Sequence, residues 1–256
     1  MAEKFEEQVI VVKQEEIAEG IYSLVIQTEQ IAAHAKAGQF VSVYCNDGTK
    51  LLPRPISICE IDKEAGTLRL VYRVAGKGTP EFSQYKVGDK VKVLGPLGNG
   101  FTKQDKKAFL IGGGIGIPPM LQLAKELDCE KQMVLGYRTN DLFLADEFKA
   151  YGDVYVATED GTAGTKGNVL NAIRENALTA DVIYACGPTP MLRALKEYAA
   201  ENNIECWISM EERMACGIGA CLACVCKSKE KDHHTNVHNK RICKEGPVFR
   251  AEEVEL

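Results

Sequence analysis

Five cysteines near the C-terminal end of the 256-residue chain are the clearest chemical signal in the sequence. Cys216, Cys221 and Cys224 follow the spacing C-x4-C-x2-C, and eighteen residues separate Cys224 from Cys243. Plant-type [2Fe–2S] clusters are bound by four thiolates at this kind of spacing. Residues 217–220 have small side chains, apart from one isoleucine, so backbone amides there can approach the cluster closely. We therefore predict a [2Fe–2S] cluster with these four cysteines as its ligands.

Other metal sites fit the same segment less well. Structural zinc usually pairs one C-x2-C with a second, which is missing here, and a Rieske cluster would need Cys-x-His, which does not occur. Cys226, separated from Cys224 by one residue, is expected to point away, although a ligand swap between the two stays open. The trio His233, His234 and His238 is expected to be a solvated loop rather than a metal site.

A second signal lies near residue 54, in the sequence LPRPISI. Arg54 offers a bidentate fork suited to a pyrophosphate, and Ser57 offers a hydroxyl that could bond the reactive edge of an isoalloxazine ring. Downstream, Gly78 and Thr79 open a short predicted helix, where unpaired amides favour an anion. An arginine flanked by prolines is often only a rigid turn, so this motif gains weight only from the nucleotide-binding motifs further along the chain.

The third signal is a pair of loops that follow predicted strands. In GGGIGIPP, the glycines allow a pyrophosphate to approach the backbone, although Pro119 takes the last position of the usual G-x-G-x-x-G pattern. In CGPTPM, the loop again leaves the carboxyl end of a strand. Both loops should face one crevice, where α/β folds bind ligands. The expected nicotinamide-binding residues are Gly112, Gly113, Gly114, Gly116, Cys186, Gly187 and Pro188.

The elements that must position these residues divide the chain into three. Residues 1–100 contain six short β-branched runs separated by turns, which predicts a small antiparallel β-barrel. Residues 101–208 alternate strands with helices, expected at 118–127, 141–151, 168–175 and 191–201, which predicts an α/β domain with a parallel sheet. Residues 209–256 have little apolar content and cannot build a core of their own, so a bound metal must hold them together. We expect them to form a small cluster-binding segment.

Composition limits the possible partners. The chain is 45% hydrophobic and 26% charged with a net charge of −5, which argues against a nucleic-acid surface. No apolar run of about eighteen residues is present, so we expect no membrane span. The N-terminus lacks the pattern of a signal peptide, which predicts a cytoplasmic protein. In that compartment ten cysteines indicate metal binding rather than disulfides.

The order RPIS, GKGT, GGGIGIPPM, CGPTPM resembles the ferredoxin–NADP reductase superfamily over roughly residues 6 to 205. That resemblance implies FAD on the barrel and a nicotinamide on the sheet domain. The segment MACGIGACLACVC with the closing CKEGPVF resembles the electron-transfer subunits of type B (NAD-linked) dihydroorotate dehydrogenases. The FAD-binding residues that this implies are Arg54, Pro55, Ile56, Ser57, Val71, Tyr72, Arg73, Gly78 and Thr79, and the implied cluster ligands are Cys216, Cys221, Cys224 and Cys243.

In that family the subunit pairs with an FMN-containing catalytic subunit that oxidises dihydroorotate, two copies of each chain forming a heterotetramer. The resemblance thus implies electron flow from that partner through [2Fe–2S] and FAD to NAD+, in pyrimidine biosynthesis. A flavin must lie between nicotinamide and cluster, because it exchanges a hydride for single electrons whereas the cluster carries one. The chemistry belongs to the cofactors, and no catalytic side chain is named.

Three alternatives stay open. One is a flavin and [2Fe–2S] subunit of an NAD(P)H–ferredoxin oxidoreductase or a sulfide-linked reductase, another is the reductase component of an oxygenase, and the third is a redox sensor without turnover. The preference for NAD over NADP is also open, since Arg138 could accept a 2′-phosphate that Glu159 and Asp160 would repel.

Overall fold

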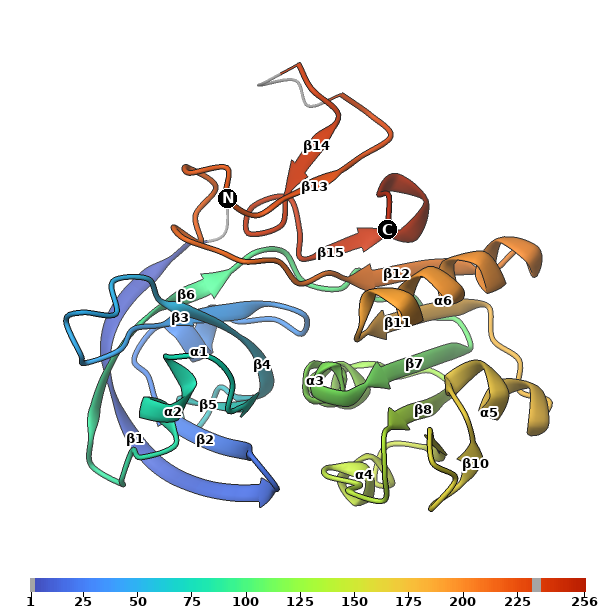
Figure 1. Cartoon of the computed structure of the whole chain (residues 1–256), viewed down its shortest axis with the longest axis horizontal. Helices are drawn as coiled ribbons and strands as arrows, with labels where there is room; N and C mark the ends of the chain where they lie inside the picture. Colours follow the sequence, from blue (N-terminus) through green and yellow to red (C-terminus); the bar gives the residue numbers. More distant parts are fainter. Residues whose placement is uncertain (1–2, 232–235) are drawn as a thin grey trace.

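The computed structural model describes residues 3–231 and 236–256. It consists of a β-barrel, an α/β domain beside it, and a C-terminal segment that lies across both (Figure 1). Among the described residues, no helix is long and apolar enough to cross a membrane.

The barrel confirms the expected antiparallel architecture of the N-terminal part. Its six strands close in the order β1-β2-β5-β4-β3-β6. Strand β1 shows why the sequence folds this way, since Val9 and Val11 point into the core while Ile10 and Val12 alternate outward. Two short helices, α1 and α2, accompany the barrel. The elements are β1 (Phe5–Ala18), β2 (Ile21–Gln27), α1 (Ile31–His34), β3 (Phe40–Val43), β4 (Arg54–Asp62), β5 (Thr67–Arg73), α2 (Thr79–Phe82) and β6 (Lys90–Leu97).

The second domain contains a seven-stranded sheet in the order β10-β9-β8-β7-β11-β12-β15. All pairs are parallel except β12 with β15. Its central strands β7 and β11 are buried at every position, as expected for a sheet covered on both faces. The elements are β7 (Ala108–Gly113), η1 (Gly114–Gly116), α3 (Pro118–Glu126), β8 (Lys131–Tyr137), α4 (Ala145–Phe148), β9 (Asp153–Thr158), β10 (Thr165–Lys166), α5 (Val169–Glu175), β11 (Val182–Cys186), α6 (Thr189–Glu201) and β12 (Glu205–Ser209).

Three of the four expected helices are present at close to the predicted bounds, but the prediction for residues 141–151 is wrong. Helix α4 occupies only Ala145–Phe148. Leu144 has a φ of 64°, which a continuous right-handed helix does not allow. The preceding turn is fixed instead by the Tyr137 hydroxyl, which donates to the Phe143 carbonyl at 2.9 Å.

The C-terminal segment has almost no regular structure of its own. A two-stranded ribbon pairs β13 (Val225–Lys227) with β14 (Asn239–Arg241). Strand β15 (Val248–Arg250) then joins the edge of the α/β sheet beside β12, and a single turn, η2 (Ala251–Glu253), follows. The segment is therefore built onto the α/β domain rather than folded apart from it.

Candidate functional site

The loop between Cys216 and Cys221 is shaped around sulfur atoms. Its amides point at two of the predicted ligands: Ala220 N lies 3.3 Å from Cys216 Sγ, and Gly219 N lies 3.1 Å from Cys243 Sγ. Gly217 and Gly219 have φ values of 67° and 85°, a region that favours glycine. Another predicted ligand, Cys224, accepts a hydrogen bond from Cys243 N at 3.4 Å. This donor set fits a cluster that needs thiolates and amide hydrogen bonds to sulfur.

The four cysteines differ in their surroundings. Cys224 and Cys243 are buried at 2% and 1% exposure, whereas Cys221 is exposed. Burial opposes ionisation of Cys216, but amides led by that of Ile218 outweigh it and lower its pKa to about 6. Burial, and then the neighbouring Cys224 thiol, raise the pKa of Cys243 to about 12. One end of the predicted cluster site therefore faces outward and the other faces the protein.

Cys226 and the nearby histidines are the other possible metal ligands in this segment. Cys226 lies on β13 with its Sγ 3.5 Å from the Lys240 carbonyl, and burial raises its pKa to about 11. His238 is exposed and bonds the Lys229 carbonyl, while His233 and His234 lie outside the described residues. Across the described chain, no three Cys, His, Asp or Glu side chains gather as a single metal ion would need. A [2Fe–2S] cluster is instead bound by four thiolates, two on each iron.

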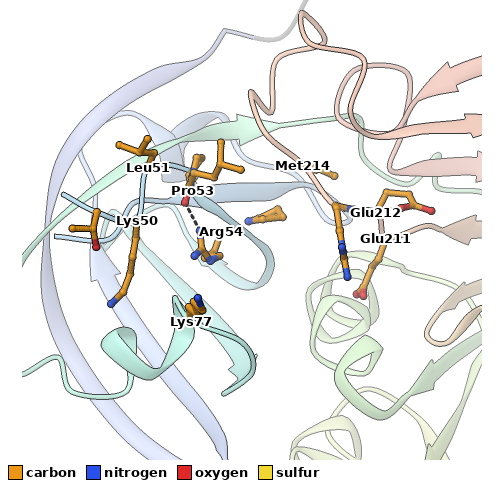
Figure 2. Close-up of a pocket in the computed structure, with 12 residues that line it drawn as sticks. Lys50, Leu51, Pro53, Arg54, Lys77, Glu211, Glu212 and Met214 are labelled. Carbon is orange, nitrogen blue, oxygen red and sulfur yellow. Dashed lines mark hydrogen bonds between the residues drawn. The ribbon is translucent and has the colours of Figure 1, made fainter. Parts of the chain in front are cut away.

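A cavity of about 800 Å³ opens beside the cluster loop. Figure 2 shows Arg54 and Lys77 on its barrel side, facing Glu211, Glu212 and Met214 from the start of the C-terminal segment. Two basic side chains on one wall suit a phosphate-bearing ligand. This cavity therefore joins the predicted flavin segment to the predicted cluster segment.

Arg54 and Gly78 meet directly in that wall. A Cβ at Gly78 would overlap the Arg54 guanidinium, so a larger residue there would make the arginine side chain move. Thr79 holds the turn instead of facing the cavity, because its hydroxyl donates to the Ala75 carbonyl at 2.7 Å. Glu81 on α2 fixes the cavity rim by pairing with Lys50 at 2.8 Å.

A second cavity, of about 950 Å³, lies between the barrel and the α/β domain. Both predicted nicotinamide loops line it, as expected from their places after β7 and β11. The two loops touch: a Cβ at Gly116 would overlap the Cys186 carbonyl, and one at Gly113 would lie 2.7 Å from Met191 Sδ. The cavity is lined by Gly113, Gly114, Gly116, Gly187 and Pro188 among the predicted residues, while Gly112 and the buried Cys186 lie behind it.

Glu211 lines both cavities and carries no motif that could have revealed it. It lies two residues past the end of β12, so the only available signal was its place after a parallel strand. Its side chain faces the cavities, yet the surrounding protein opposes its charge and raises its pKa. The two cavities thus share one acidic wall.

The remaining predicted flavin residues lie in three different settings. Pro55 lines the first cavity, while Ile56 and Ser57 are half-buried on β4. Val71 and Tyr72 are buried on opposite faces of β5: Val71 packs against the α/β domain, whereas Tyr72 points into the barrel core, where its hydroxyl accepts from Gln14 at 2.9 Å. Arg73 lines the second cavity, beside the nicotinamide loops. The structure therefore brings Arg73 to the neighbouring site rather than to Arg54.

Asn99, just after β6, attaches the C-terminal segment to the barrel. Its amide group donates to the carbonyls of Glu245 and Val248 and accepts from Val248 N, all at 2.9–3.0 Å. Its backbone N–H donates to the Gly246 carbonyl at 2.7 Å. The cluster segment is thereby fixed against the barrel wall next to the first cavity.

Comparison with known proteins matches this three-part geometry. Residues 8–101 match the oxidoreductase FAD-binding domain, residues 110–197 the oxidoreductase NAD-binding domain, and residues 211–255 the iron–sulfur cluster binding domain of dihydroorotate dehydrogenase B. The electron transfer subunit of dihydroorotate dehydrogenase B (NAD(+)) from Bacillus pumilus is 45% identical, over 96% of each chain. That from Listeria monocytogenes serovar 1/2a is 47% identical over 96% of this chain and 97% of its own. The chain belongs to this family of dihydroorotate dehydrogenase B electron transfer subunits.

Membership of the dihydroorotate dehydrogenase B family means that the chain uses FAD, NAD and an iron–sulfur cluster in electron transfer. A solved chain of an NADH-dependent reduced ferredoxin-NADP oxidoreductase is also similar, with 33% identity, a TM-score of 0.87 and coverage of 97% of this chain and 90% of that one. A ferredoxin NADP+ reductase from Neisseria gonorrhoeae shares the fold, at 17% identity and a TM-score of 0.64, over 83% of this chain and 95% of its own.

Proposed function

We propose that this chain exchanges electrons between NAD+ and a dihydroorotate-oxidising, FMN-containing catalytic subunit, with two copies of each chain in the assembly. The observation that supports this best is the cluster loop with one exposed ligand, Cys221, beside the cavity that carries Arg54. Relatives named as electron transfer subunits of dihydroorotate dehydrogenase B imply a catalytic partner. Ten free cysteines fit a reducing, cytoplasmic compartment.

The residues that line each cavity would bind one cofactor. Arg54 and Lys77, with Gly78 leaving room for the fork, would hold the FAD phosphates, and Pro55, Ile56 and Ser57 would follow the ring system along β4. Tyr72 would support this segment through the barrel core, and Val71 through its packing against the α/β domain. When bound, FAD supplies the conversion between a hydride and single electrons. Cys216, Cys221, Cys224 and Cys243 would bind the cluster.

The second cavity would hold the nicotinamide. The glycines of residues 112–116 would bring backbone amides to its pyrophosphate, and residues 186–188 would close the opposite side. Glu211, which lines this cavity as well as the first, would separate the two cofactors from bulk water. Glu159 also lines the nicotinamide cavity and would disfavour a 2′-phosphate, consistent with NAD rather than NADP.

Purification of the native chain under anaerobic conditions tests this proposal. We expect it to co-purify with an FMN-containing partner, to carry FAD and two irons with two sulfides, and to support NAD+ reduction by dihydroorotate. A preparation that carried zinc, or that reduced NAD+ without any partner, would contradict the proposal.

A flavin and [2Fe–2S] subunit of an NAD(P)H–ferredoxin oxidoreductase is the second candidate. It is favoured by the TM-score of 0.87 to a chain of an NADH-dependent reduced ferredoxin-NADP oxidoreductase. The partner found in the purification decides between the two, because this candidate predicts ferredoxin reduction and no response to dihydroorotate.

A further inference from the structure

Four charged side chains join the barrel to the α/β domain, away from the residues that line the two cavities. Arg69 on β5 donates through Nη1 to Glu60 on β4 at 2.6 Å, and through Nη1 and Nη2 to Glu147 on α4 at 2.6 and 3.0 Å. Glu60 also pairs with Lys125 on α3. We call Glu60, Arg69, Lys125 and Glu147 the interdomain clamp. It crosses the domain boundary twice.

The interdomain clamp is more buried than an ordinary surface ion pair. The Arg69 side chain is only 15% exposed, and Ser23 accepts its remaining Nε–H at 2.9 Å. Burial alone would raise the pKa of Glu60, but hydrogen bonds from Arg69 and Lys125 outweigh it and lower that pKa. A bidentate guanidinium held on three sides has a defined direction, which isolated lysine pairs lack.

A neutral contact reinforces the same boundary. The backbone N–H of Ile61 on β4 donates to Gln122 Oε1 on α3 at 2.7 Å, and the Gln122 side chain is buried. Gln122 in turn donates to Glu126 at 2.9 Å, so its orientation is fixed. Helix α3 packs along β4 over this region (Figure 1).

The two elements that meet here carry the two predicted cofactor segments at their other ends. Strand β4 begins with Arg54–Ser57 and ends beyond Glu60, while α3 begins directly after the glycine loop of residues 112–116 and ends beyond Lys125. The second cavity takes walls from both domains, with Ile21 and Arg73 opposite Gly113 and Gly187. The width of that cavity therefore depends on the angle between the domains.

We propose that the interdomain clamp is a positioning device, which fixes the angle at which a nicotinamide in the second cavity meets a flavin held along β4. This rests on the proposed exchange of electrons between nicotinamide and flavin. The clamp residues touch neither reactant and act only through β4 and α3. Hydride transfer is sensitive to this angle, because a misplacement of about 1 Å can cost on the order of a hundredfold in rate.

The test compares the single variants Glu147→Gln and Lys125→Met and their double variant with the wild-type holoprotein. We expect amide hydrogen exchange of Ile61 to accelerate about tenfold in the double variant, because local opening would become easier. In anaerobic single turnovers, flavin reduction by NADH should slow about tenfold, with a larger isotope effect from 4-deuterated NADH. FAD content, cluster content and flavin reduction by dithionite should not change.

Glu130→Gln is the matched control, because it removes an ion pair with Lys107 (2.7 Å) that lies within the α/β domain. It should match the wild type in every readout. The proposal is overturned if the double variant keeps wild-type exchange at Ile61 and wild-type flavin reduction, or if it loses FAD and dithionite reduction equally. Failure of the wild type itself to react with NADH would instead refute the proposed function.

Discussion

The two boundaries of the barrel are held by different chemistry. Toward the C-terminal segment, Asn99 makes neutral hydrogen bonds to backbone groups of residues 245–248, and β15 continues as a strand of the α/β sheet. Toward α3 and α4, Arg69 and Glu60 form ion pairs whose outer member, Glu147, is 43% exposed. The first boundary consists of neutral hydrogen bonds from Asn99 to backbone groups, and the second consists of ion pairs between charged side chains.

This difference matches what each boundary must do. A cluster and a flavin both stay bound, so the segment between them gains from rigid backbone attachment. A nicotinamide enters and leaves the second cavity, which has walls from both domains, so a boundary of side-chain contacts permits small adjustments while defining an angle. Ion pairs between side chains can rearrange more easily than paired strands, which suits orientation better than permanent attachment.

Loss of a cluster ligand should have the largest effect. Cys243→Ser removes a thiolate that is only 1% exposed and accepts from Gly219 N, so we expect complete loss of the reduced-cluster EPR signal and of bound iron and sulfide. Flavin reduction by NADH should persist, which would show that the two boundaries work separately. Cys226→Ser is the control and should retain the cluster. If the cluster survived in Cys243→Ser but not in Cys226→Ser, the fourth ligand would be Cys226 and not Cys243.

Asn99→Ala should weaken the rigid boundary by about 2–3 kcal/mol, because it removes three side-chain hydrogen bonds and leaves backbone groups unpaired. The expected result is a cluster that is lost faster to an iron chelator, with NADH-driven flavin reduction unchanged. Asn202→Ala, which removes one exposed hydrogen bond at the C-terminal end of α6, is the control. Equal chelator rates in the two variants would show that Asn99 does not fix the segment.

Gly116→Ala should act only on the nicotinamide side. Its Cβ would overlap the Cys186 carbonyl and push the two loops apart, so we expect the KM for NADH to rise about tenfold, as for loss of one good hydrogen bond. FAD and cluster content should stay at wild-type levels. Gly48→Ala, where a Cβ would meet no atom within 4 Å, is the control. A fall in cluster content in Gly116→Ala would show that the two boundaries do not act independently.

Glu211→Gln should give the smallest effect of these variants, a change in how the stability of the chain depends on pH. The surrounding protein partly desolvates the Glu211 carboxylate and raises its pKa, so the folded cofactor-free chain binds a proton that the unfolded chain has already released as pH rises above about 4.5. Wild-type stability should therefore fall as pH rises from the ordinary Glu pKa through the raised one. Urea unfolding at several pH values should show a weaker fall in Glu211→Gln, and identical pH profiles would contradict this.

The sequence predicted what depends on local spacing. The cysteine spacing, the glycines after β7 and the arginine between two prolines are set by neighbours within a few residues, and the barrel and parallel sheet followed from alternating patterns. The expected helix at 141–151 was wrong because the left-handed Leu144 and the Tyr137–Phe143 bond break a pattern that looked periodic. Domain limits and individual ligand roles stay predictions.

Long-range placement could not be read from the sequence. The resemblance assigns Arg73 to a flavin segment, and β5 brings its side chain to the second cavity, because the two domains face each other there. Glu211 reaches both cavities because β12, the strand that precedes it, pairs with β11 on one side and with β15 on the other. Arg69 and Glu147 are 78 residues apart, and nothing local in either segment indicates their contact.

The most direct measurement of the central claim is an anaerobic titration of the holoprotein with NADH, followed by flavin absorbance and by EPR of the cluster. We predict that bleaching of the flavin is accompanied by the signal of a reduced [2Fe–2S] cluster, and that both are lost together when Arg54→Gln removes the flavin. A flavin that bleaches fully while the iron–sulfur cluster stays oxidised would contradict the account.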